Sequence, residues 1–161
     1  MPKPDYPTTA AVRFLRRGKV AFEPCRYRYA GGGARLAAAS LELNAHTVVK
    51  ILVMEDEHQN PLMILMHGDR EVSTKALARQ VGKKQITPCQ PSRSEKLTGY
   101  QVGGISPFGT RKPLPVYVEA SIFELPIIYI NGGKRGFLVK IAPDVLQQAL
   151  PVTLVSVAIR R

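Results

Sequence analysis

The chain has 161 residues, of which 45% are hydrophobic and 22% are charged, the composition of one soluble globular domain with a sizeable core. No stretch reaches the roughly 18 uninterrupted apolar residues that a membrane span needs. With 23 Lys and Arg against 12 Asp and Glu, the formal net charge is +11 and the pI is near 10.0. This charge favours a polyanionic partner, although a basic surface can also simply keep a protein soluble.

The elements predicted before residue 45 are two helices with a strand between them. Val12 and Leu15 share one face of the first helix, which is the spacing of an amphipathic helix. We expect a loose arm over 1–7, followed by a helix that Thr8 or Thr9 caps and Gly18 ends. A strand is expected over 20–29, and Pro24 places it at an edge or a bulge of the sheet. A flexible connector (30–34) then leads to a helix over 35–43 that stops at Asn44.

The middle of the chain is predicted to contain two adjacent strands followed by helices. Residues 46–54 have apolar side chains on both faces of a strand, so this strand is expected to be central and buried. The remaining elements are a turn (55–61), a strand (62–67), a helix that Ser73 caps and Gly82 ends (74–81), a short helix or turn that begins at Ser92 or Ser94, and a glycine-containing loop (98–109).

The last third of the chain is predicted to be mainly strands. No internal repeat and no domain boundary is visible, so a single domain is expected over 1–161. The mixture of elements indicates an α/β or α+β fold built on a mixed sheet. The expected strands are 116–119, 127–131, 137–141 and 153–159, and Pro143 and Asp144 suit the first turn of a helix over 144–150.

Lys50 is the residue most informative about chemistry. Side chains alternate along a strand, so Lys50 shares a face with Val48, Leu52 and Met54. A charged ammonium on an otherwise apolar face is costly unless it is paired or faces a wet cleft. Lys50 is therefore interpreted either as a strand-end lysine that reaches solvent or as the floor of a pocket for an anionic or carbonyl oxygen.

Two glycine-rich segments, TGYQVGGISP at 98–107 and INGGKRG at 130–136, are candidate binding loops. Glycine lets a ligand approach the main chain closely, and clustered N–H groups can bind an anion or an oxyanion. Neither segment has the spacing of a named phosphate-binding loop. For the second segment a plain turn between two strands is the competing interpretation, because Asn-Gly is the strongest short hairpin signal.

The residue types of common catalytic and metal sites show no recognisable arrangement. The three histidines lack metal-ligand spacing, and His67 is expected at the surface, where a strand ends. Cys25 and Cys89 form no CxxC and are expected to be small buried residues, not nucleophiles. The cysteine usage and an N-terminus without the apolar core of a signal peptide fit a cytoplasmic protein. Neither a metal nor a nucleotide cofactor is implied, and an enzyme of this kind would supply positioning and backbone donors.

The order of VVKILV around Lys50, then TGYQVGGISPFG, then YINGGKRG resembles the YbaK/EbsC family of freestanding aminoacyl-tRNA editing proteins, from about Thr9 to the C-terminus. That family is related to the editing domain inserted in bacterial prolyl-tRNA synthetase. The resemblance implies a compact fold around a mixed, partly barrel-like sheet surrounded by helices. It also implies trans-editing deacylation of mischarged tRNA, best known for Cys-tRNA(Pro), in which the substrate's own thiol attacks its ester carbonyl and releases tRNA and a cyclic thiolactone.

The resemblance also implies roles for single residues. Lys50 matches the essential family lysine and Gly103 the glycine whose backbone lines the pocket, so these two are the expected catalytic residues. Tyr27 matches the pocket tyrosine, and Tyr29 is a possible substitute with the same facing. Asn131 matches the small polar residue before the last Gly-Gly. The other expected substrate contacts are Thr98, Gly99, Tyr100, Gly104, Ile105, Ser106, Gly132 and Gly133.

For the segment INGGKRG, the resemblance implies a role in binding the end of the charged tRNA. Asn131 is expected to face the aminoacyl group, while Gly132 and Gly133 clear space for the terminal adenosine of the tRNA. Lys134 and Arg135 are expected to meet phosphate.

Two departures from the family pattern leave the edited amino acid open. The well-known cysteine-editing members have serine where this chain has Asn131, and the segment CRYRYAGGGA replaces the usual acidic, histidine-containing stretch. Cysteine on tRNA(Pro) is the first expectation, and Ala-tRNA(Pro) or another small amino acid removed by water is the alternative. A non-catalytic tRNA-binding module is a further alternative. Prolyl-tRNA synthetase is an expected partner if the small domain cannot select the tRNA by itself.

Overall fold

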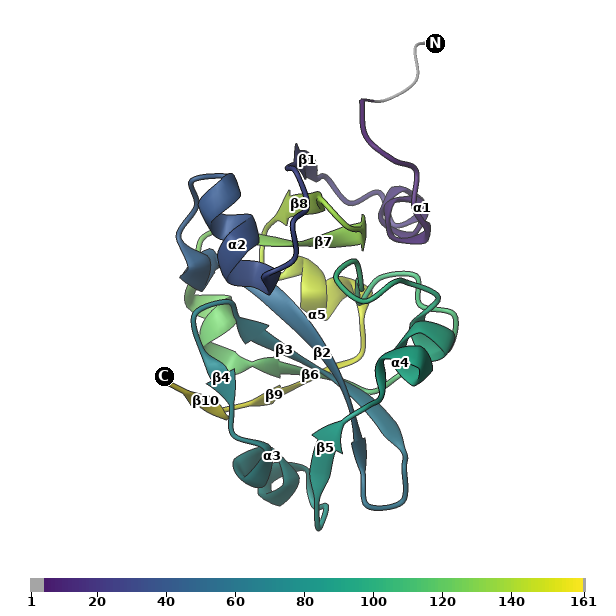
Figure 1. Ribbon diagram of the computed structural model, residues 1–161, viewed down its shortest axis with the longest axis vertical. Coiled ribbons are helices and arrows are strands. Elements are labelled where there is room, and N and C mark those ends of the chain that lie inside the picture. Colours follow the sequence, from purple (N-terminus) through teal and green to yellow (C-terminus); the bar gives the residue numbers. More distant parts are fainter. Residues whose placement is uncertain (1–4, 161) are drawn as a thin grey trace.

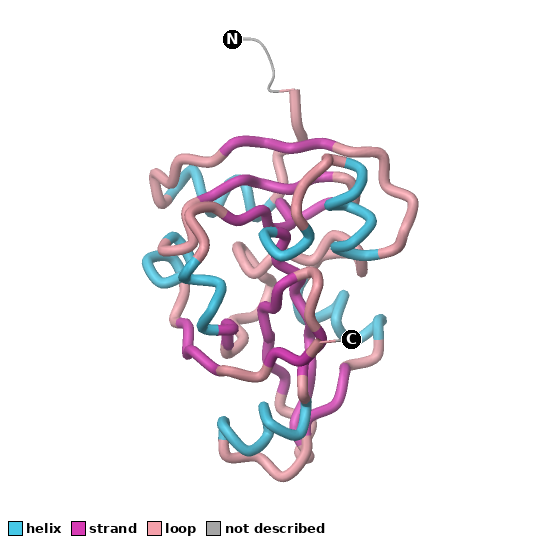
Figure 2. Tube along the Cα trace, turned by 90° about the vertical axis from the view of Figure 1, so that its left-hand side faces the viewer, coloured by secondary structure: helices cyan, strands magenta, loops and turns pink. Residues whose placement is uncertain are grey.

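The computed structural model describes residues 5–160 and contains one mixed sheet with helices around it (Figures 1 and 2). Strand β2 (Val48–Asp56) is antiparallel to β3 (Pro61–His67) and to β5 (Ile86–Pro88), and parallel to β7 (Ile128–Lys134). The expected mixed α/β fold and the central position of the strand that carries Lys50 are therefore confirmed. The full strand order is β1 (Glu23–Arg26), β8 (Phe137–Ile141), β7, β2, β3, β6 (Val116–Glu119) and β9 (Val152–Val155), with β5 beside β2.

The helices are short and cover the sheet on several sides (Figure 2). Helix α3 lies at the end of the molecule opposite to β1 and β8 (Figure 1). No helix in the described part of the chain combines the length and apolar character needed to cross a membrane. The helices are α1 (Ala10–Arg17), α2 (Gly33–Ser40), α3 (Thr74–Val81), α4 (Pro91–Thr98) and α5 (Val145–Ala149), with 3-10 turns η1 (Ala45–Thr47) and η2 (Ala120–Glu124).

Two helices begin and end as the sequence predicts. Thr9 caps α1 by accepting from the Val12 N–H, and Gly18 follows its last residue. Ser73 caps α3 by accepting from Ala76, and Gly82 ends that helix in the left-handed conformation. In both cases a side-chain oxygen satisfies one of the free N–H groups of the first turn.

Helices α2 and α4 differ from their predicted bounds. Helix α2 ends at Ser40, not at Asn44, because Glu42 adopts a φ of 56° and the Leu43 N–H returns to the Ala38 carbonyl at 2.8 Å. This is the Schellman arrangement, with glutamate in the place where glycine is usual. Helix α4 begins at Pro91, before both predicted serines, since proline fits the first helical position without losing a hydrogen bond.

The predicted strands 20–29 and 153–159 are found at the expected positions, but the observed strands are shorter. Of residues 20–29 only Glu23–Arg26 pair, at the sheet edge that Pro24 indicated. The predicted strand 153–159 is broken, because the Gln80 side chain binds both backbone groups of Ser156. The chain then continues as β10 (Ala158–Ile159), which pairs with β4 (Glu71–Val72) in a separate two-stranded sheet.

The predicted loose arm is wrong for Tyr6. Its ring stacks on Phe137 with 5.8 Å between centroids and meets Phe22 edge-on, and Arg16 donates to its hydroxyl at 2.9 Å. Residues 1–4 of that arm lie outside the described residues.

Candidate functional site

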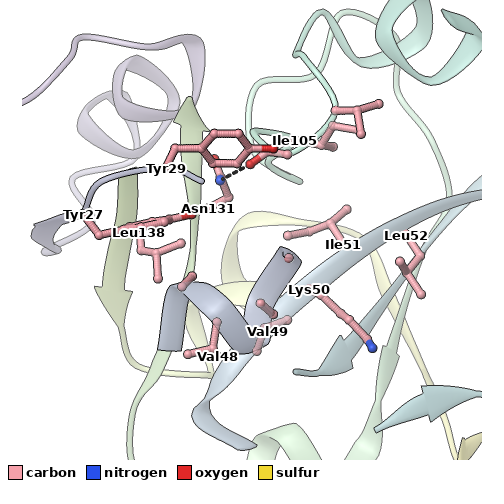
Figure 3. Close-up of a pocket in the computed structure, with 15 residues that line it drawn as sticks. Tyr27, Tyr29, Val48, Val49, Lys50, Ile51, Leu52, Ile105, Asn131 and Leu138 are labelled. Atoms are coloured by element: carbon pink, nitrogen blue, oxygen red, sulfur yellow. Dashed lines mark hydrogen bonds between the residues drawn. The ribbon is translucent and has the colours of Figure 1, made fainter. Parts of the chain in front are cut away.

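A cavity of about 320 Å³ lies between α2, the start of β2, β7 and the loop after α4 that carries Gly103 and Gly104, which we call the glycine loop (Figure 3). We call this cavity the central cavity. Apolar side chains form much of its wall, and its polar groups come from separate segments of the chain. Its lining residues are Tyr27, Tyr29, Gly33, Ala34, Ala37, Val48, Val49, Lys50, Ile51, Leu52, Val102, Gly103, Ile105, Asn131 and Leu138.

Five of the residues predicted from the sequence meet in the central cavity. Lys50 comes from β2, Gly103 and Ile105 from the loop after α4, Asn131 from β7, and Tyr27 from the segment after β1. The sheet order explains this meeting, because β7 pairs with the first two residues of β2 and therefore lies beside Lys50. Segments that are far apart in the sequence are thus brought to one pocket.

Asn131 connects two of these segments. Its Nδ2 donates to the Gly103 carbonyl at 3.2 Å (Figure 3), and its Oδ1 accepts from the Gly133 N–H at 2.6 Å and from the Lys134 N–H at 3.1 Å. An asparagine amide has two donor hydrogens and one acceptor oxygen. Only one N–H of Asn131 therefore remains for a bound molecule, and most of its bonding capacity holds the site together.

Gly103 is held close to the ring of Tyr29. Its φ is 92°, and a Cβ at this position would lie 2.5 Å from the Tyr29 hydroxyl oxygen. A side chain here would be strained and would displace the tyrosine. Tyr29, considered from sequence as a substitute for Tyr27, lines the cavity together with it, and burial raises the pKa of the Tyr27 hydroxyl.

The stem of Lys50 lines the central cavity, but its ammonium group is directed elsewhere. In Figure 3 the nitrogen points away from Tyr29, Asn131 and Ile105. It lies 3.8 Å from Glu71 on β4, where the lysine side chain is 20% exposed and the glutamate 48%. Lys50 is thus neither a free strand-end lysine nor aimed at Gly103; it is paired at the edge of the pocket.

Arg135 contacts two residues that line the central cavity. Its Nε donates to the Val102 carbonyl at 2.8 Å, and its guanidinium lies 5.2 Å from the centroid of the Tyr29 ring. Lys134 is exposed and has no ion pair among the residues that the structure describes. The two predicted phosphate contacts therefore differ, since the guanidinium already binds the loop and the ammonium does not.

Three of the predicted substrate contacts are buried and bonded within the protein. Thr98 donates to the Ser94 carbonyl, Tyr100 donates from its hydroxyl to the Phe108 carbonyl, and the Ser106 oxygen accepts from the Phe108 N–H. Their exposures are 1%, 7% and 0%. None of them lines the central cavity, so their prediction as direct contacts is not supported; they shape the loop that carries Gly103.

The glycines of INGGKRG are required by internal packing. A Cβ at Gly132 would lie 2.4 Å from the Phe137 ring, and one at Gly133 would lie 2.8 Å from the Tyr100 ring. The protein's own side chains therefore occupy the space that each missing Cβ leaves, while the expected room for an adenosine stays a prediction. Thr9 also donates from its hydroxyl to the Gly132 carbonyl, which ties α1 to this segment.

The two remaining predicted glycines also have structural roles. Gly99 ends α4 with a φ of 81°. Gly104 lets the loop approach the Lys134 and Arg135 backbone, which a Cβ would meet at 2.8–3.1 Å. Neither glycine lines the central cavity.

The segment INGGKRG is a turn between two strands, as the competing interpretation held, but the turn is not at Asn131-Gly132. Strand β7 continues to Lys134 through a bulge between Asn131 and Lys134, and β8 begins at Phe137. The turn is formed by Arg135 and Gly136. Asn131, whose side chain bonds to Gly103, stands at the start of this bulge.

His67 is buried, and its prediction as a surface residue is wrong. Its exposure is 1%, and its ring nitrogens contact the His46 carbonyl and the Ser121 hydroxyl, each at 2.7 Å. The His46 ring stacks on it at 3.7 Å and contacts Asp69 at 2.9 Å. Among the described residues, no group of three or more His, Cys, Asp or Glu is arranged to hold a metal ion.

Sequence reasoning missed Glu71 and the α2 side of the central cavity. Gly33, Ala34 and Ala37 line that side, but small residues on a short helix are more often simple packing residues. Glu71 lies next to Lys50 on β4, which pairs with β10, and no spacing in the sequence signals that contact. The apolar α2 wall of the central cavity and the pairing of Lys50 with Glu71 were therefore not predictable from the sequence.

Comparison with known proteins gives these features a context. The family described as the aminoacyl-tRNA editing domain matches residues 33–149. The chain belongs to this family. Membership confirms the resemblance to YbaK/EbsC editing proteins, and the matched range contains Lys50, Gly103 and Asn131 together with α2.

Two relatives illustrate this membership, and one solved structure shares the fold. The chain is 28% identical over 140 residues to the "Putative Cys-tRNA(Pro)/Cys-tRNA(Cys) deacylase EbsC" of Enterococcus faecalis (strain ATCC 700802 / V583), covering 86% of this chain and 85% of that protein. It is 29% identical over 105 residues to a proline--tRNA ligase of Limosilactobacillus fermentum (strain NBRC 3956 / LMG 18251), covering 63% of this chain and 18% of the ligase. The crystal structure of a "putative trans-editing enzyme for prolyl tRNA synthetase" aligns with a TM-score of 0.82 and 22% identity, covering 96% and 99% of the two chains.

Proposed function

We propose that this protein is an aminoacyl-tRNA deacylase that acts in trans, and that the central cavity receives the aminoacyl ester of a mischarged tRNA. The observation that carries the proposal is the meeting of Lys50, Gly103 and Asn131 in one cavity of about 320 Å³. Family membership supports the reaction class. The net charge of +11 suits an RNA substrate, whose phosphates attract a basic protein.

Gly103 supplies a backbone donor to the ester in this proposal. Within residues 5–160 its N–H has no hydrogen-bond acceptor, while its carbonyl is held by Asn131. A fixed N–H of this kind stabilises the negative charge that develops on the carbonyl oxygen during cleavage. Asn131 thereby acts as a positioning residue, because it fixes the peptide that donates.

Lys50 acts on the same ester after leaving Glu71. An ion pair at 3.8 Å with a half-exposed carboxylate is weak, since water screens it. The flexible four-carbon stem of lysine allows the ammonium to turn toward a ligand. Lys50 then either polarises the scissile carbonyl or holds the 3′ end of the tRNA.

The nucleophile comes from the substrate in the leading form of this proposal. Among the residues that line the central cavity there is no cysteine, serine, threonine or histidine. For Cys-tRNA(Pro), the substrate sulfur forms a bond to its own ester carbonyl and the bond to the ribose oxygen breaks. The thiol proton passes to that oxygen, giving tRNA and a thiolactone. Orientation of such an intramolecular attack lowers the barrier by several kcal/mol.

Removal of alanine or another small amino acid by water is the second candidate. The observation that favours it is the apolar lining from Ala34, Ala37, Val48 and Leu138, which suits a methyl group as well as a thiol. Asn131 offers at most one free N–H, so it gives little preference for a polar side chain.

The deciding experiment is deacylation of tRNA(Pro) charged with cysteine, alanine or serine. We compare wild type with Lys50→Ala, and use Lys75→Ala on α3, an exposed lysine, as the matched control. Loss of cysteine alone, abolished in Lys50→Ala and unchanged in Lys75→Ala, supports the thiol-assisted reaction. Cleavage of alanine or serine moves the protein to the water-using candidate.

Absence of cleavage for every substrate contradicts a self-sufficient deacylase. Retained tRNA binding would then identify a non-catalytic module. Activity that appears only after addition of prolyl-tRNA synthetase would identify a required partner.

A further inference from the structure

A second cavity, of about 370 Å³, lies beside the β7–β8 turn. We call it the turn cavity. It differs from the central cavity in being lined by three cations and one carboxylate among aromatic residues. Its lining residues are Asp5, Tyr6, Pro7, Arg26, Tyr27, Lys134, Arg135, Gly136 and Phe137.

The cations of the turn cavity are only weakly neutralised. Arg26 lies 3.6 Å from Asp5, but their side chains are 60% and 106% exposed, so solvent screens this pair. Lys134 has no ion pair among the described residues. Arg135 is different, because it is already bound to the Val102 carbonyl and lies over Tyr29. Arg26 also donates from one guanidinium nitrogen to the exposed Asp5 carbonyl at 3.1 Å, which leaves its other N–H groups for a ligand. These groups and the Lys134 ammonium are the donors of the turn cavity that can meet an anion.

The turn cavity adjoins the central cavity. Tyr27 lines both, and its N–H donates to the Gly136 carbonyl at 3.0 Å. On the other side, Gly104 of the loop rests on the backbone of Lys134 and Arg135. A ligand that leaves the central cavity across Tyr27 therefore meets the turn cavity next.

We propose that the turn cavity binds the internucleotide phosphate next to the terminal adenosine of a single-stranded RNA 3′ end, with Arg26 and Lys134 as its ligands. This inference rests on the proposed function and assigns the substrate a second contact. Cations beside an aromatic ring are the arrangement that proteins use for single-stranded nucleic acid, where the ring stacks with a base or sugar and the cations meet the phosphate. Arg135 orders the wall between the two cavities and does not hold the phosphate.

The test uses the double variant Arg26→Ala/Lys134→Ala and a control of equal charge change, Lys75→Ala/Arg79→Ala. Both control residues are exposed on α3, at the end of the molecule opposite to β1 and β8 (Figure 1). Binding of the trinucleotide CCA is measured over a range of salt. Loss of two charge-assisted phosphate contacts is expected to weaken it about tenfold, against about twofold in the control.

The salt dependence gives an independent readout. Each neutralised phosphate on a single strand contributes roughly 0.7 to the slope of log affinity against log salt, and the two cations bind one phosphate, so the slope should decrease by about that amount in the double variant. Among the described residues that line the cavity, Asp5 is the one carboxylate, so Asp5→Asn should shift the affinity in the opposite direction. Equal affinities of the double variant and its control would overturn the proposal. So would wild-type binding of inorganic phosphate as tightly as CCA, because the cavity would then hold free phosphate.

Activity separates this inference from the proposed function. The double variant should lose about tenfold in kcat/KM on aminoacyl-tRNA but keep that on an aminoacyl ester of adenosine, which has no phosphate. If wild type cleaves neither substrate, the proposed function fails while CCA binding still decides the turn cavity. If both substrates lose equally in the double variant, the cavity is part of the central site and the proposal is wrong.

Discussion

The side-chain amide of Asn131 donates to the Gly103 carbonyl at 3.2 Å and thereby joins β7 to the glycine loop. The same side chain accepts two N–H groups of the bulge that follows it. A single residue thus fixes both the loop that lines the central cavity and the strand beside it. Serine, which the cysteine-editing relatives were expected to have here, is too short to make all three bonds.

Replacing Asn131 should therefore affect stability and catalysis separately. In Asn131→Ala the N–H groups of Gly133 and Lys134 lose their acceptor, which should lower the free energy of unfolding by about 1–3 kcal/mol. In Asn131→Ser a hydroxyl can still accept from the bulge, so stability should change less while kcat falls because Gly103 is released. Denaturation and deacylation kinetics are measured on both. An unchanged kcat in both variants would contradict a positioning role.

Gly103→Ala should reduce deacylation through Tyr29. The added Cβ would lie 2.5 Å from the Tyr29 hydroxyl at a φ of 92°, so the ring must move. The matched control is Gly82→Ala, which has a φ of 74° but nothing within 4 Å of the added atom. Each should cost about 1 kcal/mol of stability from the backbone conformation. Only Gly103→Ala should lose about tenfold or more in kcat/KM, and equal activities would exclude the steric argument.

Arg135 can be distinguished from a simple phosphate contact by a conservative change. Arg135→Lys keeps the charge but lacks the Nε–H that donates to Val102 and the flat group that lies over Tyr29. If Arg135 acts by ordering the cavity wall, the lysine variant should lose about as much kcat/KM as Arg135→Ala while RNA affinity stays within about twofold of wild type. Full rescue of activity by lysine would show that charge alone matters.

The sequence was informative where local chemistry decides the structure. Helix caps at Thr9 and Ser73 and the central strand around Lys50 were predictable, because each depends on a residue and its near neighbours. The left-handed conformation of Glu42 was not predictable, since glutamate stands there in place of the usual glycine. The break of the last strand at Ser156 was not predictable either, because it depends on Gln80, which is remote in sequence.

The site was predictable as a set of segments but not as a set of contacts. The motifs led to Lys50, Gly103 and Asn131, which do line one cavity. They also led to Tyr100 and Ser106, whose polar atoms are used inside the protein. A family motif contains both the residues that contact a ligand and the residues that shape the surrounding loop. The sequence alone does not distinguish these two groups.

The pair of Lys50 and Glu71 gives a further prediction. Lys50→Met should lower kcat/KM by about a hundredfold or more, because it removes the ammonium group that the proposed function brings to the ester. Glu71→Gln keeps the shape and removes the charge that holds Lys50 at 3.8 Å. If the ammonium must leave Glu71 to reach the ester, this variant should retain the wild-type kcat/KM or exceed it. A loss similar to that of Lys50→Met would place Glu71 in the reaction instead.

His67 should make the fold less stable in mild acid. Burial lowers its pKa below the ordinary value of 6.5, so the unfolded chain binds the proton more readily than the folded protein. Stability is therefore full above pH 6.5 and falls as the pH decreases from there toward the folded pKa, by up to about 1.4 kcal/mol per pH unit. Urea unfolding between pH 5 and 7.5 should show this slope in wild type and in the control His58→Gln, whose side chain is 76% exposed. His67→Gln should lower stability at every pH but remove that slope, and an unchanged slope would assign the effect to another group.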